Sequence, residues 1–298
     1  MPHIKQALCD AAMVSENWKY SLRDLPELLD TVCAYYKRRF DVDGITPDQI
    51  MSFNGSQDGM GHMGLALLND GDVVLLPDPC YPVFITGVKL GGGVPYYYHL
   101  TKEHNFLPNV KEIPDDVADK AKIMIVSLPA NPVGSVGSPE LYQEIVDFCN
   151  AHKILLIHDN AYSDIIFDGA VGHSIFNIPG AETCAVEFFS LSKSFNVTGA
   201  RVSIFGGPPR CDCRMQEAAH PDRFRQVHPG AESRHCRYDR PAGAHQGPVC
   251  RIPAPPRRPV RGLPLHRLGC AGQPRLHVRL GTGPAGPRHQ HGVLHGND

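Results

Sequence analysis

Apolar residues in the first two-thirds of the chain recur with two different periods, which predicts alternating helices and strands. Residues 23–40 carry apolar side chains at three-to-four spacing, which gives a helix one apolar face: Leu25, Leu28, Leu29, Val32, Tyr35 and Tyr36. Three further helices are predicted over residues 57–70, 81–92 and 138–153. The last of these has Ser138 in position to cap its N-terminus and Pro139 at its first helical position.

Short, mostly apolar runs lie between these helices and predict strands over residues 72–78, 93–100, 121–129, 154–159 and 186–192. Apolar strands separated by helices are typical of a parallel sheet that is covered by helices on both faces. Ligands of such α/β proteins collect at the carboxyl ends of the strands. Four polar residues fall at or just beyond the predicted strand ends and are the first candidates for a site: Asn131, Asp159, Ser190 and Lys193.

The composition of the chain changes near Gly207. Residues 1–207 hold 10 Lys and 4 Arg against 25 acidic residues, a net charge of −11, whereas residues 208–298 hold no Lys and 15 Arg against 6 acidic residues, a net charge of +9. Proline recurs too often in the second segment for a helix or a strand. We therefore expect an irregular tail rich in Arg, Pro and His that is disordered or weakly structured. A shift of reading frame near codon 207 is a hypothesis that accounts for this composition.

The bulk properties are those of an ordinary soluble protein. The chain has 298 residues, a formal net charge of −2 and 42% hydrophobic residues. No stretch approaches about 18 uncharged apolar residues, so no transmembrane helix is predicted. The first twenty residues contain no apolar segment of the kind found in secretory signals. We expect a cytoplasmic protein whose cysteines are reduced.

Lys193 is the residue whose surroundings first indicate chemistry. A lysine is usually a solvated surface charge, but this one follows an apolar run and lies between small hydroxyl residues. A desolvated amine is nucleophilic and can form a Schiff base. The spacing S-x-S-K-x7-R adds Ser190, Ser192 and Arg201, and two hydroxyls with a guanidinium make a plausible phosphate pocket. A reactive lysine beside a phosphate pocket suits pyridoxal 5′-phosphate (PLP).

Five segments, in order along the chain, resemble the class I/II aminotransferases, which are the fold-type I PLP enzymes. They are NGSQDGM, PDPCYPVF, SLPANPVG, IHDNAYSDIIFDG and EFFSLSKSFNVTGARV, and the match covers roughly residues 15–207. In detail they look closest to the branch that contains the LL-diaminopimelate and alanine-type aminotransferases. The resemblance implies an α/β fold, the fold-type I large domain, with a mostly parallel seven-stranded sheet and helices on both faces.

The resemblance also implies an incomplete member of that family with three parts. Residues 1–45 would be the remnant of an N-terminal helical segment, and residues 46–207 would be the PLP-binding large domain. Residues 208–298 would be a tail unlike the family, without an identifiable arginine to bind the α-carboxylate of a substrate.

By resemblance, ten residues bind the cofactor: Ser56, Gln57, Tyr81, Asn131, Asp159, Tyr162, Ser190, Ser192, Lys193 and Arg201. Three of them are also implied to be catalytic. Lys193 would form the Schiff base and move the α-proton of the substrate. Asp159 would pair with the protonated pyridine nitrogen, and Tyr162 would donate to the phenolic oxygen of the cofactor.

Each of these roles has a structural alternative. The alternative for the NGSQDG segment is a simple N-capped loop, and the alternative for Tyr81 is a core tyrosine. Asp159 reads as a helix N-cap or as one partner of a structural salt bridge. Because Asp159 ends an apolar strand, where an unpaired carboxylate is costly, it requires a partner of some kind.

The implied activity is transfer of an amino group between an L-amino acid and a 2-oxo acid, in a homodimer, with no metal, nucleic acid or membrane partner. The alternative is an impaired aminotransferase remnant that binds PLP without turnover. The basic tail leaves nonspecific binding of nucleic acid open, although it lacks aromatic residues for stacking on bases. A zinc site would use tail residues, but they lack a C-x2-C pair: Cys211, Cys213, His235, Cys236 and residues 289–291.

Overall fold

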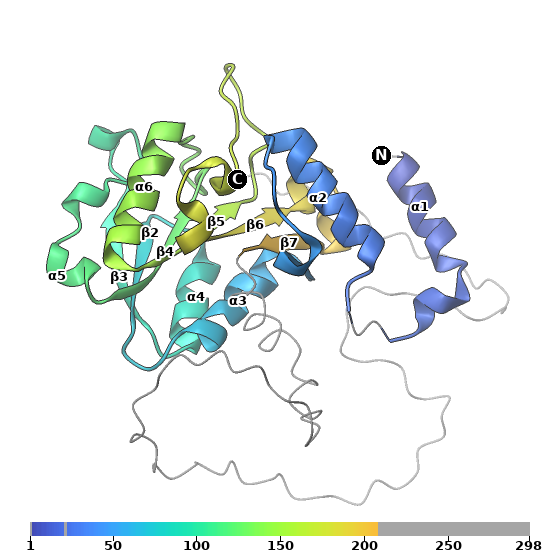
Figure 1. Ribbon diagram of the computed structural model, residues 1–298, viewed down its shortest axis with the longest axis horizontal. Helices are drawn as coiled ribbons and strands as arrows, with labels where there is room; N and C mark the ends of the chain where they lie inside the picture. Colours follow the sequence, from blue (N-terminus) through green and yellow to red (C-terminus); the bar gives the residue numbers. More distant parts are fainter. Residues whose placement is uncertain (1, 21–22, 208–298) are drawn as a thin grey trace, which may run out of the picture. The chain divides into compact units, whose positions relative to one another are not determined.

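The computed structural model describes residues 2–20 and 23–207. The expectations about residues 208–298, including the irregular tail and the alternative zinc and nucleic-acid sites, lie outside the described residues. Within the described part, one sheet with helices on both faces organises the chain (Figure 1).

The sheet of the described residues has seven strands in the order β1-β7-β6-β5-β4-β2-β3. β7 is antiparallel to both of its neighbours, and the other neighbouring pairs are parallel. The strands are β1 (Ile50–Phe53), β2 (Val73–Asp78), β3 (Val94–His99), β4 (Ala121–Ser127), β5 (Leu155–Asn160), β6 (Ala185–Ser190) and β7 (Ser203–Gly206). The predicted mostly parallel, seven-stranded α/β sheet is therefore confirmed.

Helices on the two faces of this sheet cover it, whereas α1 (Pro2–Ala12) has no buried residue and does not belong to either layer. The other described helices are α2 (Pro26–Phe40), α3 (Ser56–Leu67), α4 (Pro82–Leu90), α5 (Asp115–Ala118), α6 (Pro139–His152), α7 (Ala181–Cys184) and α8 (Leu191–Ser194). Figure 1 shows α3 and α4 together below the sheet, whereas α2 and α6 lie above it. The helix predictions hold at the start of α6, where the Ser138 side chain accepts a hydrogen bond from the Leu141 amide.

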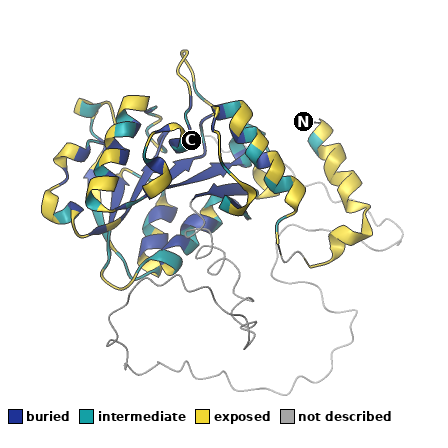
Figure 2. Cartoon of the chain, in the orientation of Figure 1, coloured by how far each residue is buried: buried dark blue, intermediate teal, exposed yellow. Residues whose placement is uncertain are grey.

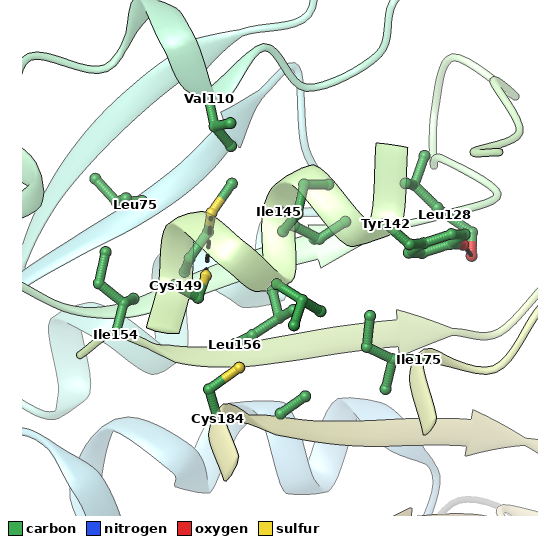
Figure 3. Packing of buried hydrophobic residues seen from close by; sticks show 14 of the residues in the cluster. Leu75, Val110, Leu128, Tyr142, Ile145, Cys149, Ile154, Leu156, Ile175 and Cys184 are labelled. Carbon is green, nitrogen blue, oxygen red and sulfur yellow. Dashed lines mark hydrogen bonds between the residues drawn. The ribbon is translucent and has the colours of Figure 1, made fainter. Parts of the chain in front are cut away.

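Strand alternation divides the core between the two faces, and the strands are the most buried part of the fold (Figure 2). On one face, Leu156 of β5 packs with Tyr142, Ile145 and Cys149 of α6 (Figure 3). On the other face, Ile157 of β5 belongs to the cluster that packs between the sheet and helices α3 and α4. Successive residues of a strand point to opposite faces, so each residue of β5 can be assigned to one face.

Two boundaries of the fold differ from the sequence prediction. The strand predicted over residues 186–192 ends at Ser190, and the chain turns at once into the single turn of α8. The four-residue strands β1 and β7 were not predicted, because each is too short to show an alternating pattern. Lys193 therefore lies in α8, three residues beyond the end of β6.

Glycines allow α3 and α4 to approach each other closely. A Cβ atom added at Gly64 of α3 would overlap the carbonyl oxygen of Gly87 in α4 and would lie 3.2 Å from the amide nitrogen of Gly91. Both of these atoms belong to the backbone, so they cannot move aside as a flexible side chain can. The contact between the two helices thus depends on the absence of a side chain.

We expect Gly64→Ala to lower the free energy of unfolding by about 3 kcal/mol, because α3 and α4 must separate to admit the methyl group. Gly61→Ala, three residues earlier on α3, is the matched control, since no atom lies within 4 Å of its added Cβ. That change should be neutral or stabilise the helix by up to about 1 kcal/mol. Urea unfolding of both variants measures the difference, and equal effects would contradict the close packing.

Candidate active site

The candidate site lies where strands β4, β5 and β6 end. Ser127, the last residue of β4, pairs in register with Asp159 of β5. Ser127 lies two residues beyond Ile125, and Asp159 lies two residues beyond Ile157. Both isoleucines pack in the cluster between the sheet and helices α3 and α4. Ser127 and Asp159 therefore share the face that α3 and α4 cover. Ser190 ends β6 at the same edge of the sheet.

Asp159 is buried there with an unsatisfied oxygen. Its side chain is 6% exposed, and its Oδ1 atom has no hydrogen-bond partner. Burial raises the pKa of the Asp159 carboxyl to about 6, His158 lowers it, and Glu187 raises it. Asp159 lies inside β5 rather than at a helix start, and it forms no ion pair with any described residue. Neither structural alternative for Asp159 accounts for this carboxylate.

Lys193 and Asp159 both lie close to Tyr162. Ser190 ends β6 and also caps α8, because its hydroxyl accepts a hydrogen bond of 3.3 Å from the amide of Ser192. The half-buried Lys193 side chain follows, with its Nζ atom 5.7 Å from the ring centroid of Tyr162. Burial, Asp159 and Tyr81 together raise the pKa of the Tyr162 hydroxyl. Three predicted residues, Tyr81, Asp159 and Lys193, thus each lie close to a fourth, Tyr162.

The segment that carries Tyr162 is anchored to α2. The Nε atom of Arg39 lies 2.6 Å from Oδ1 of Asp164, and the hydroxyl of Tyr35 donates to Oδ2 of the same carboxylate over 3.1 Å. Arg39 also donates to the carbonyl oxygen of Ser163. Because the Arg39 and Asp164 side chains are only 29% and 21% exposed, water screens this pair less than a surface pair. These contacts fix the backbone on the C-terminal side of Tyr162.

A second group of predicted residues meets at the N-terminus of α3. Gly55 precedes the helix at φ +87°, and Ser56 and Gln57 are its first two residues. The guanidinium of Arg201 occupies the space that a side chain on Gly55 would need. Unpaired amide N–H groups and a guanidinium together attract an anion. The guanidinium of Arg201 thus lies against the NGSQDG segment, a contact that the capped-loop alternative does not require.

Tyr81 and Asn131 occupy two further positions around the strand ends. The half-buried Tyr81 precedes α4, and its ring meets that of Phe84 edge-on at 6.0 Å, so it also belongs partly to the core. Asn131 lies in a turn after β4 that two backbone hydrogen bonds close, from Gly134 to Ala130 and from Ala130 to Ser135. The structure places both residues beyond strand ends, and their contacts with a cofactor stay a prediction.

Sequence reasoning missed several polar residues in these strands. The hydroxyls of Ser127 and Ser203 are buried and unpartnered, and Ser203 pairs in register with Ser190. His158 and Glu187 are fully buried and bonded to each other on the opposite face. A signal was available for these two, because a charged or imidazole side chain inside an apolar strand must have a buried partner. The serines gave no such signal.

The geometry shows an α/β protein with an arginine against the N-terminus of α3 and a lysine beyond the carboxyl end of β6. Comparison with known proteins makes this more specific. A model of the family "Aminotransferase class I and II" matches residues 1–224. The chain belongs to this family, whose cofactor is PLP, and the match extends beyond the predicted residues 15–207 at both ends.

Individual relatives agree with the family match. The LL-diaminopimelate aminotransferase of Aquifex aeolicus is 42% identical over 193 residues, which are 64% of this chain and 50% of the relative. The enzyme of the same name from Dehalococcoides mccartyi (strain ATCC BAA-2266) is 40% identical over 207 residues, or 69% and 53% of the two chains. These names confirm the resemblance to the LL-diaminopimelate branch. The chain spans about half the length of the curated relatives it matches.

Solved structures give the same result for the fold. Substrate-bound BacF from Bacillus subtilis matches with a TM-score of 0.71 and 32% identity, over 74% of this chain and 56% of that chain. An aromatic aminotransferase from Pyrococcus horikoshii matches with a TM-score of 0.69 and 29% identity, over 74% and 60% of the two chains. The predicted fold type is therefore confirmed.

Residues 2–20 and 23–207 contain no group of three or more His, Cys, Asp or Glu side chains arranged to hold a metal ion. None of the helices in these residues is both long enough and apolar enough to cross a membrane.

Proposed function

We propose that this chain is a PLP-dependent aminotransferase that moves an amino group between an L-amino acid and a 2-oxo acid. The observation that carries the proposal is the buried, unpaired Oδ1 of Asp159, at the same sheet edge as Lys193. A buried carboxylate oxygen needs a cationic or donor partner. The protonated nitrogen of a pyridine ring supplies one, so the residues present fit PLP.

The phosphate of the cofactor would bind at the N-terminus of α3. Five residues are proposed to hold it: Ser56, Gln57, Ser190, Ser192 and Arg201. Backbone N–H groups at a helix start bind such an anion, and the fork of Arg201 adds two donors. Ser190 and Ser192 are buried and flank Lys193 in the sequence, so they would keep the phosphate end of the site close to the amine.

The remaining residues would orient the ring and the amine. Tyr81 would lie against the ring, and Asn131 and Tyr162 would donate hydrogen bonds to its phenolic oxygen. When bound, the cofactor supplies an aldehyde that takes up amines and a cationic ring that accepts electrons from the substrate. The amine of Lys193 would take the proton from the α-carbon of the substrate and return it during the transfer. Asp159 would keep the ring nitrogen protonated.

The names of the relatives suggest LL-diaminopimelate as one amino-acid substrate of this chain. A homodimer is part of the proposal, as the family resemblance implies. So is a reducing, cytoplasmic location, which is supported by the five free cysteines of the described residues: Cys9, Cys33, Cys80, Cys149 and Cys184.

The test is a titration of the full chain with PLP, followed by absorbance. We expect the cofactor band to change on binding, to change again when LL-diaminopimelate or another L-amino acid is added, and to return when a 2-oxo acid is added. Binding without the second change would assign the chain to the impaired remnant. Absence of PLP binding would contradict both the proposal and that alternative.

A further inference from the structure

A buried polar cluster lies on the face of the sheet opposite to the candidate site. His158 precedes Asp159 on β5, so their side chains point to opposite faces. On that face, Nδ1 of His158 lies 2.8 Å from Oε2 of Glu187, and Nε2 lies 3.0 Å from the carbonyl oxygen of Leu128. His158 and Glu187 are both fully buried. The mechanism proposed above uses neither of them.

The hydrogen bonds of Glu187 indicate that its carboxylate is ionised. Oε1 accepts from the hydroxyls of Tyr36 and Ser174, each over 3.0 Å. Oε2 accepts from the backbone amide of Ile175 over 2.8 Å, in addition to its contact with His158. A carboxylate that accepts several hydrogen bonds is stabilised in its charged form.

The surroundings of His158 indicate that both of its ring nitrogens carry hydrogen. One nitrogen faces the Glu187 carboxylate and the other faces the Leu128 carbonyl, and both of these groups are acceptors. Tyr142 lies 3.3 Å from Nε2 and also 3.3 Å from the Leu128 carbonyl, so its hydroxyl can donate to that carbonyl as well. The geometry is that of a buried imidazolium–carboxylate pair.

We propose that His158 is held as an imidazolium by Glu187 and acts as a positioning residue, whose charge keeps the Asp159 carboxylate ionised and ready for a cationic ring. This inference rests on the proposed function. The cost of burying the two charges is offset by their mutual attraction and by the four donors around Glu187. Charges interact over longer distances in a buried region than in water, so the imidazolium acts on the adjacent carboxylate.

Two tyrosines contact this pair: Tyr36 contacts Glu187, and Tyr142 contacts His158. Burial raises the pKa values of Tyr36 and Tyr142 well above their usual range, so both are uncharged near neutral pH. His173 is a further titratable group on that face, with its ring centroid 6.4 Å from that of Tyr142, and Cys149 and Cys184 pack in the same cluster as Tyr142. On the Asp159 side, the groups are Tyr81, Tyr162 and Lys193.

A direct test is NMR of the full chain without cofactor, with 15N-labelled histidine and 13Cγ-labelled aspartate. The protonated form of both nitrogens of His158 is expected at pH 7.5, and Asp159→Asn assigns the Asp159 signal. A neutral His158 ring in the wild-type protein would overturn the proposal. This measurement needs neither PLP nor turnover, so its failure is distinguishable from failure of the proposed function.

Substitutions of Glu187 and His158 distinguish the effect of their charges from the effect of their packing. Glu187→Gln keeps the shape but removes the charge that holds the imidazolium, and we expect the titration midpoint of Asp159 to rise by about one pH unit. His158→Gln removes the imidazolium and leaves Glu187, so the midpoint should rise further, by about two units. Tyr36→Phe is the matched control, since it removes one hydrogen bond to Glu187 without changing a charge.

We expect Tyr36→Phe to leave the Asp159 midpoint within about 0.3 units of the wild-type value. A purely structural cluster would instead give the same small change in all three variants, and that result would overturn the proposal. If His158→Gln does not fold, the proposal is tested by whether the Asp159 midpoint rises more in Glu187→Gln than in Tyr36→Phe. The wild-type nitrogen shifts decide alone if neither variant folds.

Discussion

Replacing Lys193 with alanine is expected to remove covalent attachment of PLP and to lower the rate of transamination by about 10⁴-fold or more, because one amine serves both as nucleophile and as proton carrier. Reduction with borohydride followed by intact-mass measurement tests the attachment. The wild-type chain should gain the mass of one reduced cofactor, and Lys193→Ala should gain none. Steady-state assays with an amino acid and a 2-oxo acid test the rate.

The variant is expected to keep part of its affinity for the cofactor, because the anion site at the N-terminus of α3 does not involve the Lys193 amine. Lys89→Ala is the matched control, since Lys89 is an exposed lysine in the last turn of α4. It should retain both attachment and rate. A reducible adduct of equal yield in Lys193→Ala would show that another lysine holds the cofactor.

The periods of the apolar residues predicted the central part of the fold correctly. Strands such as β5 are buried on both faces, so nearly every residue is apolar and the run is easily recognised. The short strands β1 and β7 were not recognised, because their positions depend on pairing with each other and with β6. Pairing of this kind joins residues 50–53 to residues 203–206, and a local pattern contains no information about it.

Much of the candidate site could also be predicted. The motifs name the residues, and the topology of a parallel sheet places them at the carboxyl ends of its strands. Motifs did not reveal how the chain supports these residues. The anchoring of Asp164 by Arg39 and Tyr35 joins α2 to a segment more than 120 residues away. The pair of His158 and Glu187 likewise appears only when β5 and β6 lie side by side. Such contacts depend on tertiary packing, which the sequence patterns do not specify.

Replacing Asp159 with asparagine should stabilise the cofactor-free protein above pH 6. The same change should weaken PLP binding and lower the rate of transamination. The pKa of Asp159 is about 6 in the folded chain and 3.8 as the ordinary value. The folded state therefore binds this proton more tightly than the unfolded state, so stability falls as the pH rises from about 4 to about 6. About two pH units correspond to roughly 3 kcal/mol.

Asparagine carries no charge and avoids this loss. At pH 8, Asp159→Asn should be more stable than the wild-type protein by up to about 3 kcal/mol, and below pH 4 the two should differ little. Urea unfolding of the cofactor-free proteins between pH 4 and pH 8 measures this. Asp147→Asn, at an exposed position on α6, is the control and should change stability by less than about 0.5 kcal/mol at every pH.

Addition of PLP should reverse the order of the two proteins. A ligand stabilises the folded state in proportion to its affinity, and the wild-type carboxylate offers the pyridine nitrogen an ion pair that asparagine lacks. A residue that destabilises the empty protein and strengthens ligand binding is typical of a functional site, where stability is exchanged for binding. Equal pH dependence of the wild-type and Asp159→Asn proteins would contradict this assignment. It would mean that the Asp159 carboxylate already has a partner within the chain.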